Sequence, residues 1–314
     1  MKIEKSTKKF GIFAAILLVW ALVFSNMSFG QDKNSGTDLT ISVNDVPFVM
    51  KFVEGGTFWM GAQSTNPNEQ NYDPQATSIE SPVHSVTLDD YYMSETEVTQ
   101  ALWVAVMGEK PKDNAAWHKN FGIGKNYPAY NVRWTDCQEF ILKLNQMTGK
   151  NFRMPTEAEW EYAARGGNKS KGYRYAGSDD IDKVAWYVRN SGDKYLKGSP
   201  QDNPFFYEEK VIPNHNRPHL VKSKAPNELG LYDMSGNVAE WCSDYFGLKY
   251  YLESPSYNPQ GPDKLKNDDK DWHSIRGEDY DEFPENYRLS ARHSGQSNHI
   301  SQGIGLRLVL SLID

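Results

Sequence analysis

The alternation of apolar and polar positions predicts β-strands in the first part of the chain. Within residues 47–60, Phe48, Met50 and Phe52 fall on one side of an extended segment, which gives the period of two expected of a strand. Residues 83–88 repeat this alternation before a pair of aspartates ends it. Both segments therefore read as half-buried strands of a sheet.

Three helices are predicted from pairs of capping residues that are each followed by a glycine stop. A serine or threonine with Glu or Gln three residues later can exchange hydrogen bonds with the first helical turn. The pairs and their stops are Ser94 with Glu97 before Gly108, Thr135 with Gln138 before Gly149, and Thr156 with Glu159 before Gly166.

Beyond the third predicted helix, long periodic segments stop, and glycine, proline, asparagine and aromatic residues dominate. Two stretches, 192–224 and 250–271, are predicted to be surface insertions. The apolar run 304–310 predicts a closing strand. We therefore expect one α+β domain of low regularity over residues 47–314, preceded by a flexible lead-in over residues 31–46.

The first residues have the pattern of a signal peptide. Lysines precede an apolar run from Gly11 to Phe24 that carries no charge, and Ser28 and Gly30 are small residues suited to cleavage. This run is shorter than the roughly twenty residues that a spanning helix needs. We predict that residues 1–30 are a signal peptide and that the mature protein is periplasmic or secreted, without a membrane span after cleavage. An uncleaved anchor is the alternative.

Composition excludes several classes of protein. The 314 residues are 39% hydrophobic, 24% charged and 13% aromatic, which excludes a disordered polymer, a coiled coil and a multi-span membrane protein. The net charge of −7 argues against a nucleic-acid binder. Cys137 and Cys242 are too few for a disulfide scaffold or a four-sulfur zinc site. We expect both to be small buried residues, with a disulfide between them as the alternative.

Several long motifs resemble the formylglycine-generating enzyme (sulfatase-modifying factor) family, in the order in which that family has them. They are Gly55–Gly61 (GGTFWMG), Glu95–Thr99 (ETEVT), Phe152–Gly167 (FRMPTEAEWEYAARGG), Pro226–Trp241 (PNELGLYDMSGNVAEW), Arg288–Arg292 (RLSAR) and Ile304–Arg307 (IGLR). The resemblance implies an α+β fold related to C-type lectins, which often holds calcium.

The resemblance also implies a structural calcium site. Its ligands would be Asp233, Gly236, Val238 and Glu240, with two carboxylates and two backbone carbonyls as oxygen donors. The alternative is that Asp233 and Asn237 only hydrogen-bond the turn, as such residues often do.

Copper is not expected, because the chain departs from the catalytic members of the family. Those members are understood to bind copper(I) through two cysteines near the C-terminus, and thiolates are the soft ligands that copper(I) prefers. The matching segment here, residues 276–288, contains no cysteine, and Ala239 stands where those members have tryptophan. The sequence thus predicts a non-catalytic binding or assembly module. The alternative is an oxidase that converts a sulfatase cysteine to formylglycine, or another activity in the same cleft.

A ligand groove is the last candidate site. Its predicted residues are Arg276, Glu278, Asp279, Tyr280, Arg288 and Arg292. The ligand would be a protein, a peptide or a glycan. The alternative is that these arginines pair with core carboxylates.

Two further groups of residues are not assigned to a site. Glu157, Glu159 and Glu161 are interpreted as cap and helix-end residues, with Arg153 and Arg165 as candidate partners. No histidine metal site is predicted, because Pro218 separates His215 from His219.

Overall fold

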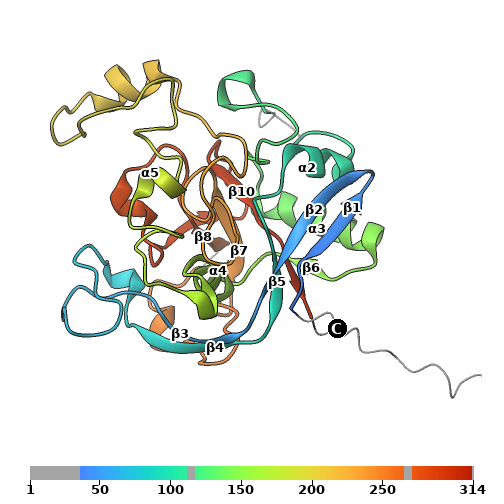
Figure 1. Ribbon diagram of the computed structural model, residues 1–314, viewed down its shortest axis with the longest axis horizontal. Helices are drawn as coiled ribbons and strands as arrows, with labels where there is room; N and C mark the ends of the chain where they lie inside the picture. Colours follow the sequence, from blue (N-terminus) through green and yellow to red (C-terminus); the bar gives the residue numbers. More distant parts are fainter. Residues whose placement is uncertain (1–35, 112–116, 265–270, 313–314) are drawn as a thin grey trace, which may run out of the picture. The chain divides into compact units, whose positions relative to one another are not determined.

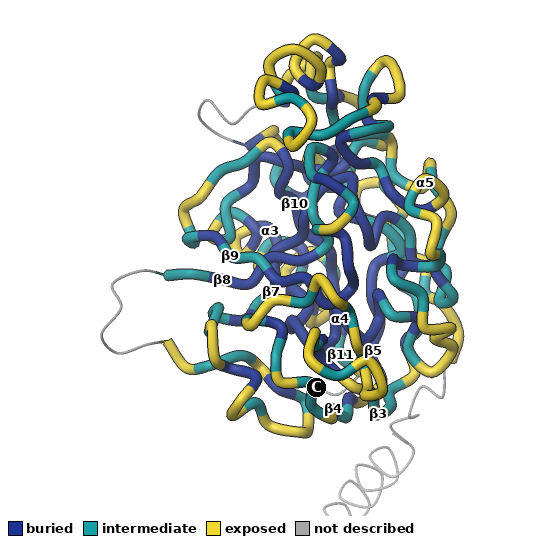
Figure 2. The backbone as a smooth tube through the Cα atoms, turned by 90° about the vertical axis from the view of Figure 1, so that its left-hand side faces the viewer, coloured by how far each residue is buried: buried dark blue, intermediate teal, exposed yellow. Residues whose placement is uncertain are grey.

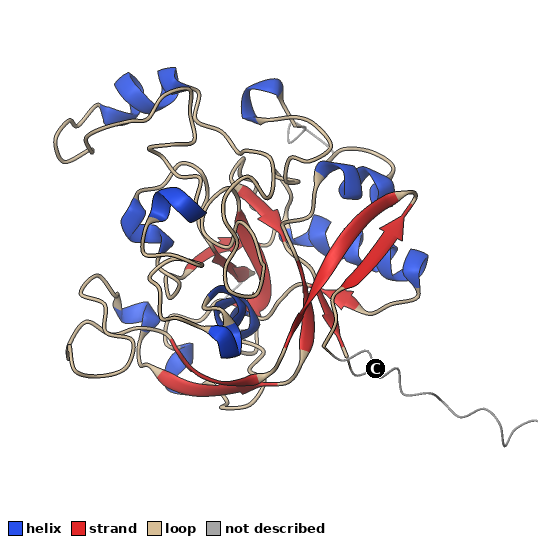
Figure 3. Ribbon diagram, viewed as in Figure 1, coloured by secondary structure: helices blue, strands red, loops and turns tan. Residues whose placement is uncertain are grey.

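A computed structural model describes residues 36–111, 117–264 and 271–312. The predicted signal peptide, residues 1–30, and the start of the predicted lead-in lie outside the described residues. Residues 36–314 form one unit, much of which consists of loops and turns (Figure 3). None of the helices in the described ranges is long and apolar enough to cross a membrane.

The larger sheet has five strands that pair antiparallel throughout. In spatial order they are β1 (Leu39–Val43), β2 (Val46–Val53), β5 (Tyr91–Ser94), β11 (Val309–Ser311) and β6 (Phe152–Arg153). Helices α2 (Gln100–Met107) and α3 (Trp134–Thr148) pack on each other and on β2 and β6 (Figure 1).

A second sheet and a two-stranded ribbon surround helix α4 (Glu157–Ala164). The sheet has the order β10 (Ile304–Leu306), β7 (Ala239–Tyr245), β8 (Trp272–Arg276) and β9 (His293–Gln296), and only its β10–β7 pair is parallel. The ribbon joins β3 (Gly56–Met60) to β4 (His84–Leu88). Helix α4 contacts β3, β7 and β8, and this central region is the most buried in Figure 2.

The remaining helical elements are short and lie in the loops. They are α5 (Ile181–Val184), η1 (Ser78–Glu80), η3 (Lys119–Phe121), η4 (Gly167–Lys169), η5 (Tyr207–Val211), η6 (Ile212–Asn214), η7 (Tyr250–Leu252) and η8 (Pro284–Tyr287).

Capping chemistry places helix α4 as the sequence predicts. The Thr156 hydroxyl accepts from the Glu159 amide at 3.2 Å, and the Glu159 carboxylate accepts from the Thr156 amide at 2.8 Å. Helix α3 ends at Gly149, in the left-handed conformation that glycine adopts without strain. Its start differs from the prediction, because Asp136 rather than Gln138 completes the cap, on the backbone of Arg133.

Helix α2 begins later than its predicted cap. Ser94 is the last residue of β5, and Thr99 caps the helix by accepting from the Leu102 amide at 3.2 Å. Glu97 does not reach back to Ser94, because its side chain is buried and accepts from Asn237 at 2.9 Å. The predicted capping box is therefore wrong, although Gly108 does end the helix.

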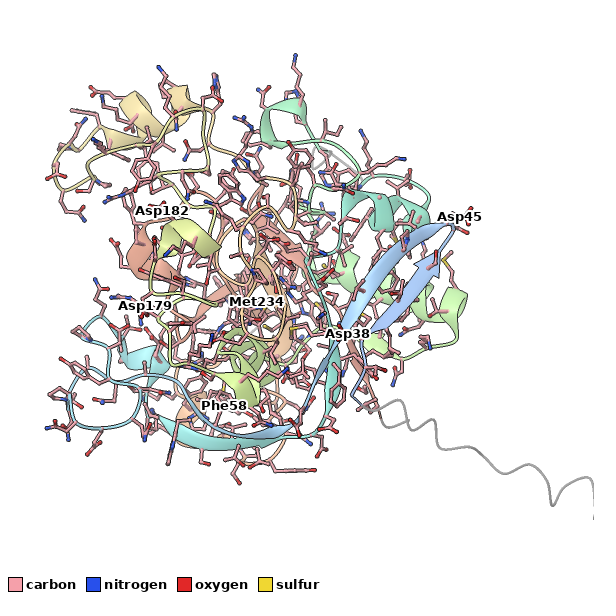
Figure 4. All side chains as sticks on the ribbon, in the orientation of Figure 1. Asp38, Asp45, Phe58, Asp179, Asp182 and Met234 are labelled. Carbon is pink, nitrogen blue, oxygen red and sulfur yellow. The ribbon has the colours of Figure 1, made fainter. Side chains whose placement is uncertain are left out.

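The predicted flexible lead-in contains a strand. Strand β1 pairs with β2 along its whole length, and Asn44 and Asp45 connect them with positive φ angles of 46° and 63°. Two such residues in succession match the tight hairpin turns that suit the twist of a β-ribbon. Asp45 lies at the tip of this hairpin in Figure 4. The alternation of Leu39, Ile41 and Val43 with Thr40 and Ser42 is the strand signal that the prediction of a lead-in overlooked.

The predicted closing strand is two strands in two different sheets. Strand β10 pairs with β7, whereas β11 pairs with β5 and β6. Between them the Arg307 side chain turns inward and is completely buried. One short run of sequence thus ties both sheets together and brings a guanidinium group into the interior.

Two apolar clusters form most of the core. One fills the space between the larger sheet and helices α2 and α3, where Trp103 stacks on Phe140 with ring centroids 5.1 Å apart. The other surrounds α4 and includes Trp160 and Ala163. Together they fix α4 and β7, which carry most of the residues considered next.

Candidate functional site

Two segments matched by the resemblance meet at one end of the two central strands, β7 and β8, of the four-stranded sheet. The loop 233–240 runs into β7, and the segment 276–288 continues from the end of β8, the neighbouring strand. The Tyr280 amide donates to the carbonyl of Asn237 at 3.0 Å, which joins the two segments. Met234, in the same loop, is labelled near the centre of Figure 4.

Helix α4 directs two glutamates at arginines from the end of the chain. Glu157 accepts from Arg276 at 3.0 Å and from two nitrogens of Arg292 at 2.7 Å each. Glu161 accepts from Arg276 at 2.6 Å. Burial alone would raise the pKa of Glu157, but Arg292 and Arg276 outweigh it and lower that pKa to about 2. All four side chains are buried and ionised, and they form an ion-pair network that Arg165 joins by donating to Glu161 at 2.9 Å.

Arg288 makes a further buried pair. Its guanidinium donates to both carboxylate oxygens of Glu80, at 2.6 and 2.8 Å. Although burial opposes it, this contact lowers the pKa of Glu80. Arg276, Arg288 and Arg292 therefore lie inside the protein on carboxylates, which corrects their assignment to an open ligand groove. A buried guanidinium needs such a partner, because an unpaired buried charge is very costly.

The structure keeps the acidic part of the predicted groove together. Glu278 pairs with His293, and Asp279 packs against Gly303, where an added Cβ atom would lie 1.8 Å from the carboxylate. Burial, reinforced by neighbouring carboxylates, raises the pKa of Asp279 well above its ordinary value. Burial likewise raises the pKa of Asp281 to about 6, and one of its oxygens is buried without a partner.

Tyr280 lies within this acidic segment and is buried. Its carbonyl accepts from the Ser191 hydroxyl at 2.8 Å, so the segment is anchored by its backbone. The carboxyl groups of this segment can bind protons or a cation near neutral pH. Thiol-based catalysis would instead require cysteine side chains at these positions.

In the 233–240 loop, the Glu240 carboxylate is fully engaged. Both of its oxygens accept from Arg307, at 2.7 to 2.9 Å, and one also accepts from the Trp160 indole at 2.7 Å. Arg307 and Glu240 are both completely buried. This bidentate pair connects the loop to the β10–β11 junction.

Asp233 has a different environment. Its Oδ2 accepts from the Lys222 amide at 2.8 Å, whereas its Oδ1 is buried with no donor other than the Glu97 carboxyl in its protonated form. Oε2 of the neighbouring Glu97 is buried and has no other partner. Burial is the main reason why the pKa of Asp233 rises to about 6, and burial and the Asp233 charge raise the pKa of Glu97 well above its usual range.

The predicted calcium ligands therefore fit in part. Asp233 offers a buried oxygen that suits a cation. Both carboxylate oxygens of Glu240, in contrast, already accept hydrogen bonds from Arg307. Gly236 keeps the conformation that the loop requires: its φ is 82°, and a Cβ atom there would lie 2.2 Å from the carbonyl of Trp186. Val238 is buried behind it. Across the described ranges, no group of three His, Cys, Asp or Glu residues is arranged to hold a metal.

Both cysteines are buried and free. Cys137 lies on α3 and Cys242 on β7, with no exposed surface on either, so the alternative disulfide is not formed. Burial raises the pKa of each thiol well above its ordinary value. A buried thiol with a raised pKa is a poor source of thiolate.

The histidines of the 192–224 stretch have separate partners. The His215 ring contacts Asp193 at 2.7 Å, and the His219 ring stacks on Trp186 at 3.6 Å between centroids. Burial lowers the pKa of His219. The His219 amide also donates to the Asn237 side chain at 2.8 Å, so this stretch covers the 233–240 loop and is no detached insertion.

Two contributors to this region have weak signals in the sequence. Glu97 belongs to a quoted motif, but its sequence position suggested a helix cap. Asp244 lies on β7, just after the motif that ends at Trp241, and its carboxylate accepts from the Glu157 amide at 3.0 Å. Its burial, and secondly the charge of Glu157, raise the pKa of Asp244 to about 8. A polar residue at a strand end gave no hint of this environment.

Comparison with known proteins identifies the family. The family model described as "Sulfatase-modifying factor enzyme 1-like domain" matches residues 43–312. The formylglycine-generating enzyme of Streptomyces coelicolor is 30% identical over 274 residues, which are 73% of this chain and 80% of that protein.

Two other similarities are relevant. Chaperone protein LppX of Paenibacillus barcinonensis is 36% identical over 194 residues, which cover 51% of this chain and 64% of LppX. The solved structure of Treponema denticola variable protein 1 aligns with a TM-score of 0.67 at 26% identity, over 87% of this chain and 99% of that one. The chain therefore belongs to the sulfatase-modifying factor enzyme 1-like (formylglycine-generating enzyme) family.

Proposed function

We propose that this protein is an exported, non-catalytic member of the family that binds another molecule or assists its assembly. The observation that carries the proposal is the position of the thiols. Cys137 and Cys242 are completely buried on different elements, and neither belongs to the segment 276–288. Copper(I) chemistry of the family's kind would need an accessible thiolate pair in that segment.

The surroundings of the missing thiols support the same proposal. The segment that should carry them holds Asp279 and Asp281, carboxyls with raised pKa values and hard oxygen donors. Ala239 supplies only a methyl group where an aromatic wall would stand. The fold does not depend on thiols in this segment, because its buried ion pairs join arginines to glutamates.

The similarity to LppX supports an assembly role, because that protein is described as a chaperone. The match covers about half of this chain, so the chaperone activity comes to it only as a proposal. Its partner would be a protein or peptide, or a glycan carried by one.

Export is the other part of the proposal. It rests on the basic, apolar and small-residue pattern of residues 1–30. N-terminal sequencing of protein recovered from the cell envelope should begin near Gln31. An intact Met1 on membrane-bound protein would instead show an uncleaved anchor.

The non-catalytic assignment is tested by copper(I) titration of the mature chain, followed by incubation with a cysteine-containing sulfatase peptide in air. The Streptomyces coelicolor enzyme serves as the positive control. We expect no stoichiometric tight copper binding and no oxidation of the peptide cysteine. Tight binding together with formylglycine in the peptide would show that the chain is an oxidase.

A further inference from the structure

The loop 61–83, which connects β3 to β4, borders an open hollow of about 730 Å³. This volume lies within the range of small-molecule sites, roughly 300–1,000 Å³. Its lining residues belong to none of the segments 233–240, 276–288 and 304–307. The loop lies at the lower left of Figure 1.

An exposed indole forms one wall of the hollow. Trp59 points to the outer face of β3, opposite its neighbours Phe58 and Met60, and 47% of its surface is accessible. Phe58 is labelled in Figure 4 and marks this strand. A flat aromatic face beside polar groups binds ligands that combine an apolar face with a polar edge.

Hydrogen bonds hold the backbone of loop 61–83 in place beside this indole. The Asn71 amide donates to the carbonyls of Trp59 and Gly61 at 2.6 and 2.8 Å, and the Ala62 amide donates to the Glu80 carbonyl at 3.0 Å. Gly61 is needed at this crossing, because a Cβ atom there would lie 2.3 Å from that carbonyl. A fixed loop loses little conformational entropy when it binds.

The lining is rich in neutral hydrogen-bonding groups. Within the described ranges, the side chains of Ser64, Gln70 and Ser78 make no hydrogen bond with the protein. Glu69 uses one oxygen to accept from Asn66 at 3.0 Å, which leaves the other available. Hydroxyl, amide and carboxylate groups together can both donate to and accept from a ligand hydroxyl.

The same lining disfavours other ligand classes. Neither lysine nor arginine lines the hollow, and Glu69 would repel an anion. A single carboxylate is too few for a calcium or transition-metal site. A purely apolar ligand would leave the hydroxyl and amide groups unpaired.

We infer that this hollow is a binding site for a neutral carbohydrate. The C–H face of a pyranose ring stacks on Trp59, and its hydroxyls bond to Glu69 and Gln70. The inference does not depend on the proposed function, because the copper and peptide assays do not involve loop 61–83.

The test is calorimetric titration of the mature chain with cellohexaose, xylohexaose, mannohexaose and chitohexaose. We expect at least one of them to bind, with an affinity that is insensitive to salt because no net charge is neutralised. Trp59→Ala should weaken that binding about tenfold, and Trp59→Phe should recover part of the loss. Glu69→Gln should weaken it severalfold. Phe205→Ala removes a 63% exposed aromatic that does not line the hollow and should change nothing.

Three outcomes would overturn the inference. The first is absence of binding to every oligosaccharide of the set. The second is binding that Trp59→Ala leaves unchanged while the melting temperature shows a folded variant. The third is salt-sensitive binding of an arginine-rich peptide, lost in Glu69→Gln, without any sugar binding, which would make the hollow a site for cations over Trp59.

Discussion

Replacing Glu157 by glutamine should destabilise the protein strongly, because this carboxylate neutralises two buried guanidinium groups. The substitution keeps the shape but replaces an oxygen that accepts from Arg276 and Arg292 with an amide that donates. Arg276 keeps Glu161 as a partner, whereas Arg292 loses its only carboxylate among the contacts described.

The expected loss follows from the burial of all three groups. Removing one partner from a buried ion pair costs about 3–5 kcal/mol in free energy of unfolding. At about 2–4 °C per kcal/mol for a chain of this size, the melting temperature should fall by about 6–20 °C. Glu139→Gln is the matched control, because Glu139 pairs with Lys143 at 2.9 Å on the exposed face of α3 and should change stability by about 0.5 kcal/mol or less.

Urea unfolding at pH 7 and at pH 3 measures the effect. The pKa of Glu157 is lowered to about 2 in the folded protein, so its stabilisation is present above pH 4.5 and is lost as the pH falls toward 2. The difference between variant and parent should therefore shrink at pH 3. A loss at pH 7 no larger than that of the Glu139 variant would refute this account of the network. Adding Arg292→Met to Glu157→Gln should recover part of the stability, because methionine can pack on Tyr251 and Phe246 without a charge.

Three further predictions concern the buried groups. The double change Cys137→Ser and Cys242→Ser should lower the free energy of unfolding by about 1–3 kcal/mol and leave ligand binding intact. A folded double variant that no longer binds its ligand would show that the thiols belong to the functional site. As the pH rises from about 4 to about 8, the Asp244→Asn variant should gain stability relative to the parent, by up to about 1.4 kcal/mol for each pH unit. The reason is that the folded parent keeps Asp244 protonated up to a pKa of about 8, whereas its unfolded chain ionises this group. Urea midpoints that depend equally on pH in variant and parent would contradict this. Calcium should raise the melting temperature above that measured in chelator, and Asp233→Ala should abolish this rise. Glu240→Gln should lower the melting temperature both with calcium and with chelator, because Arg307 loses its carboxylate partner. Identical melting curves with calcium and with chelator would show that the loop binds no ion.

Local chemistry in the sequence predicted part of the fold. Thr156 and Glu159 fixed the start of α4, because a cap is decided within one helical turn. The same pattern failed at Ser94, where a tertiary contact took precedence: Glu97 bonds to Asn237, which lies 140 positions away. The strand β1 was missed although Leu39, Ile41 and Val43 alternate with Thr40 and Ser42, which is the period of two expected of a strand.

The candidate site depended almost wholly on contacts that sequence spacing does not encode. Arg292 and Glu157 lie 135 positions apart, so the motifs around them indicate importance without indicating pairing. A carboxylate followed by distant arginines fits an open groove as well as a closed network. Burial decides between the two, and burial is known only when the sheets and α4 are assembled.

The buried ion-pair network explains how a fold with so few regular elements keeps its shape. Pairs such as Glu157–Arg292, Glu80–Arg288 and Glu240–Arg307 connect loops to helices and strands that the backbone ladders do not reach. None of these pairs involves a thiol or the residues at 278–282. Substitutions in that segment therefore leave these pairs intact, and Glu80 still anchors loop 61–83 through Arg288 and the Ala62 amide.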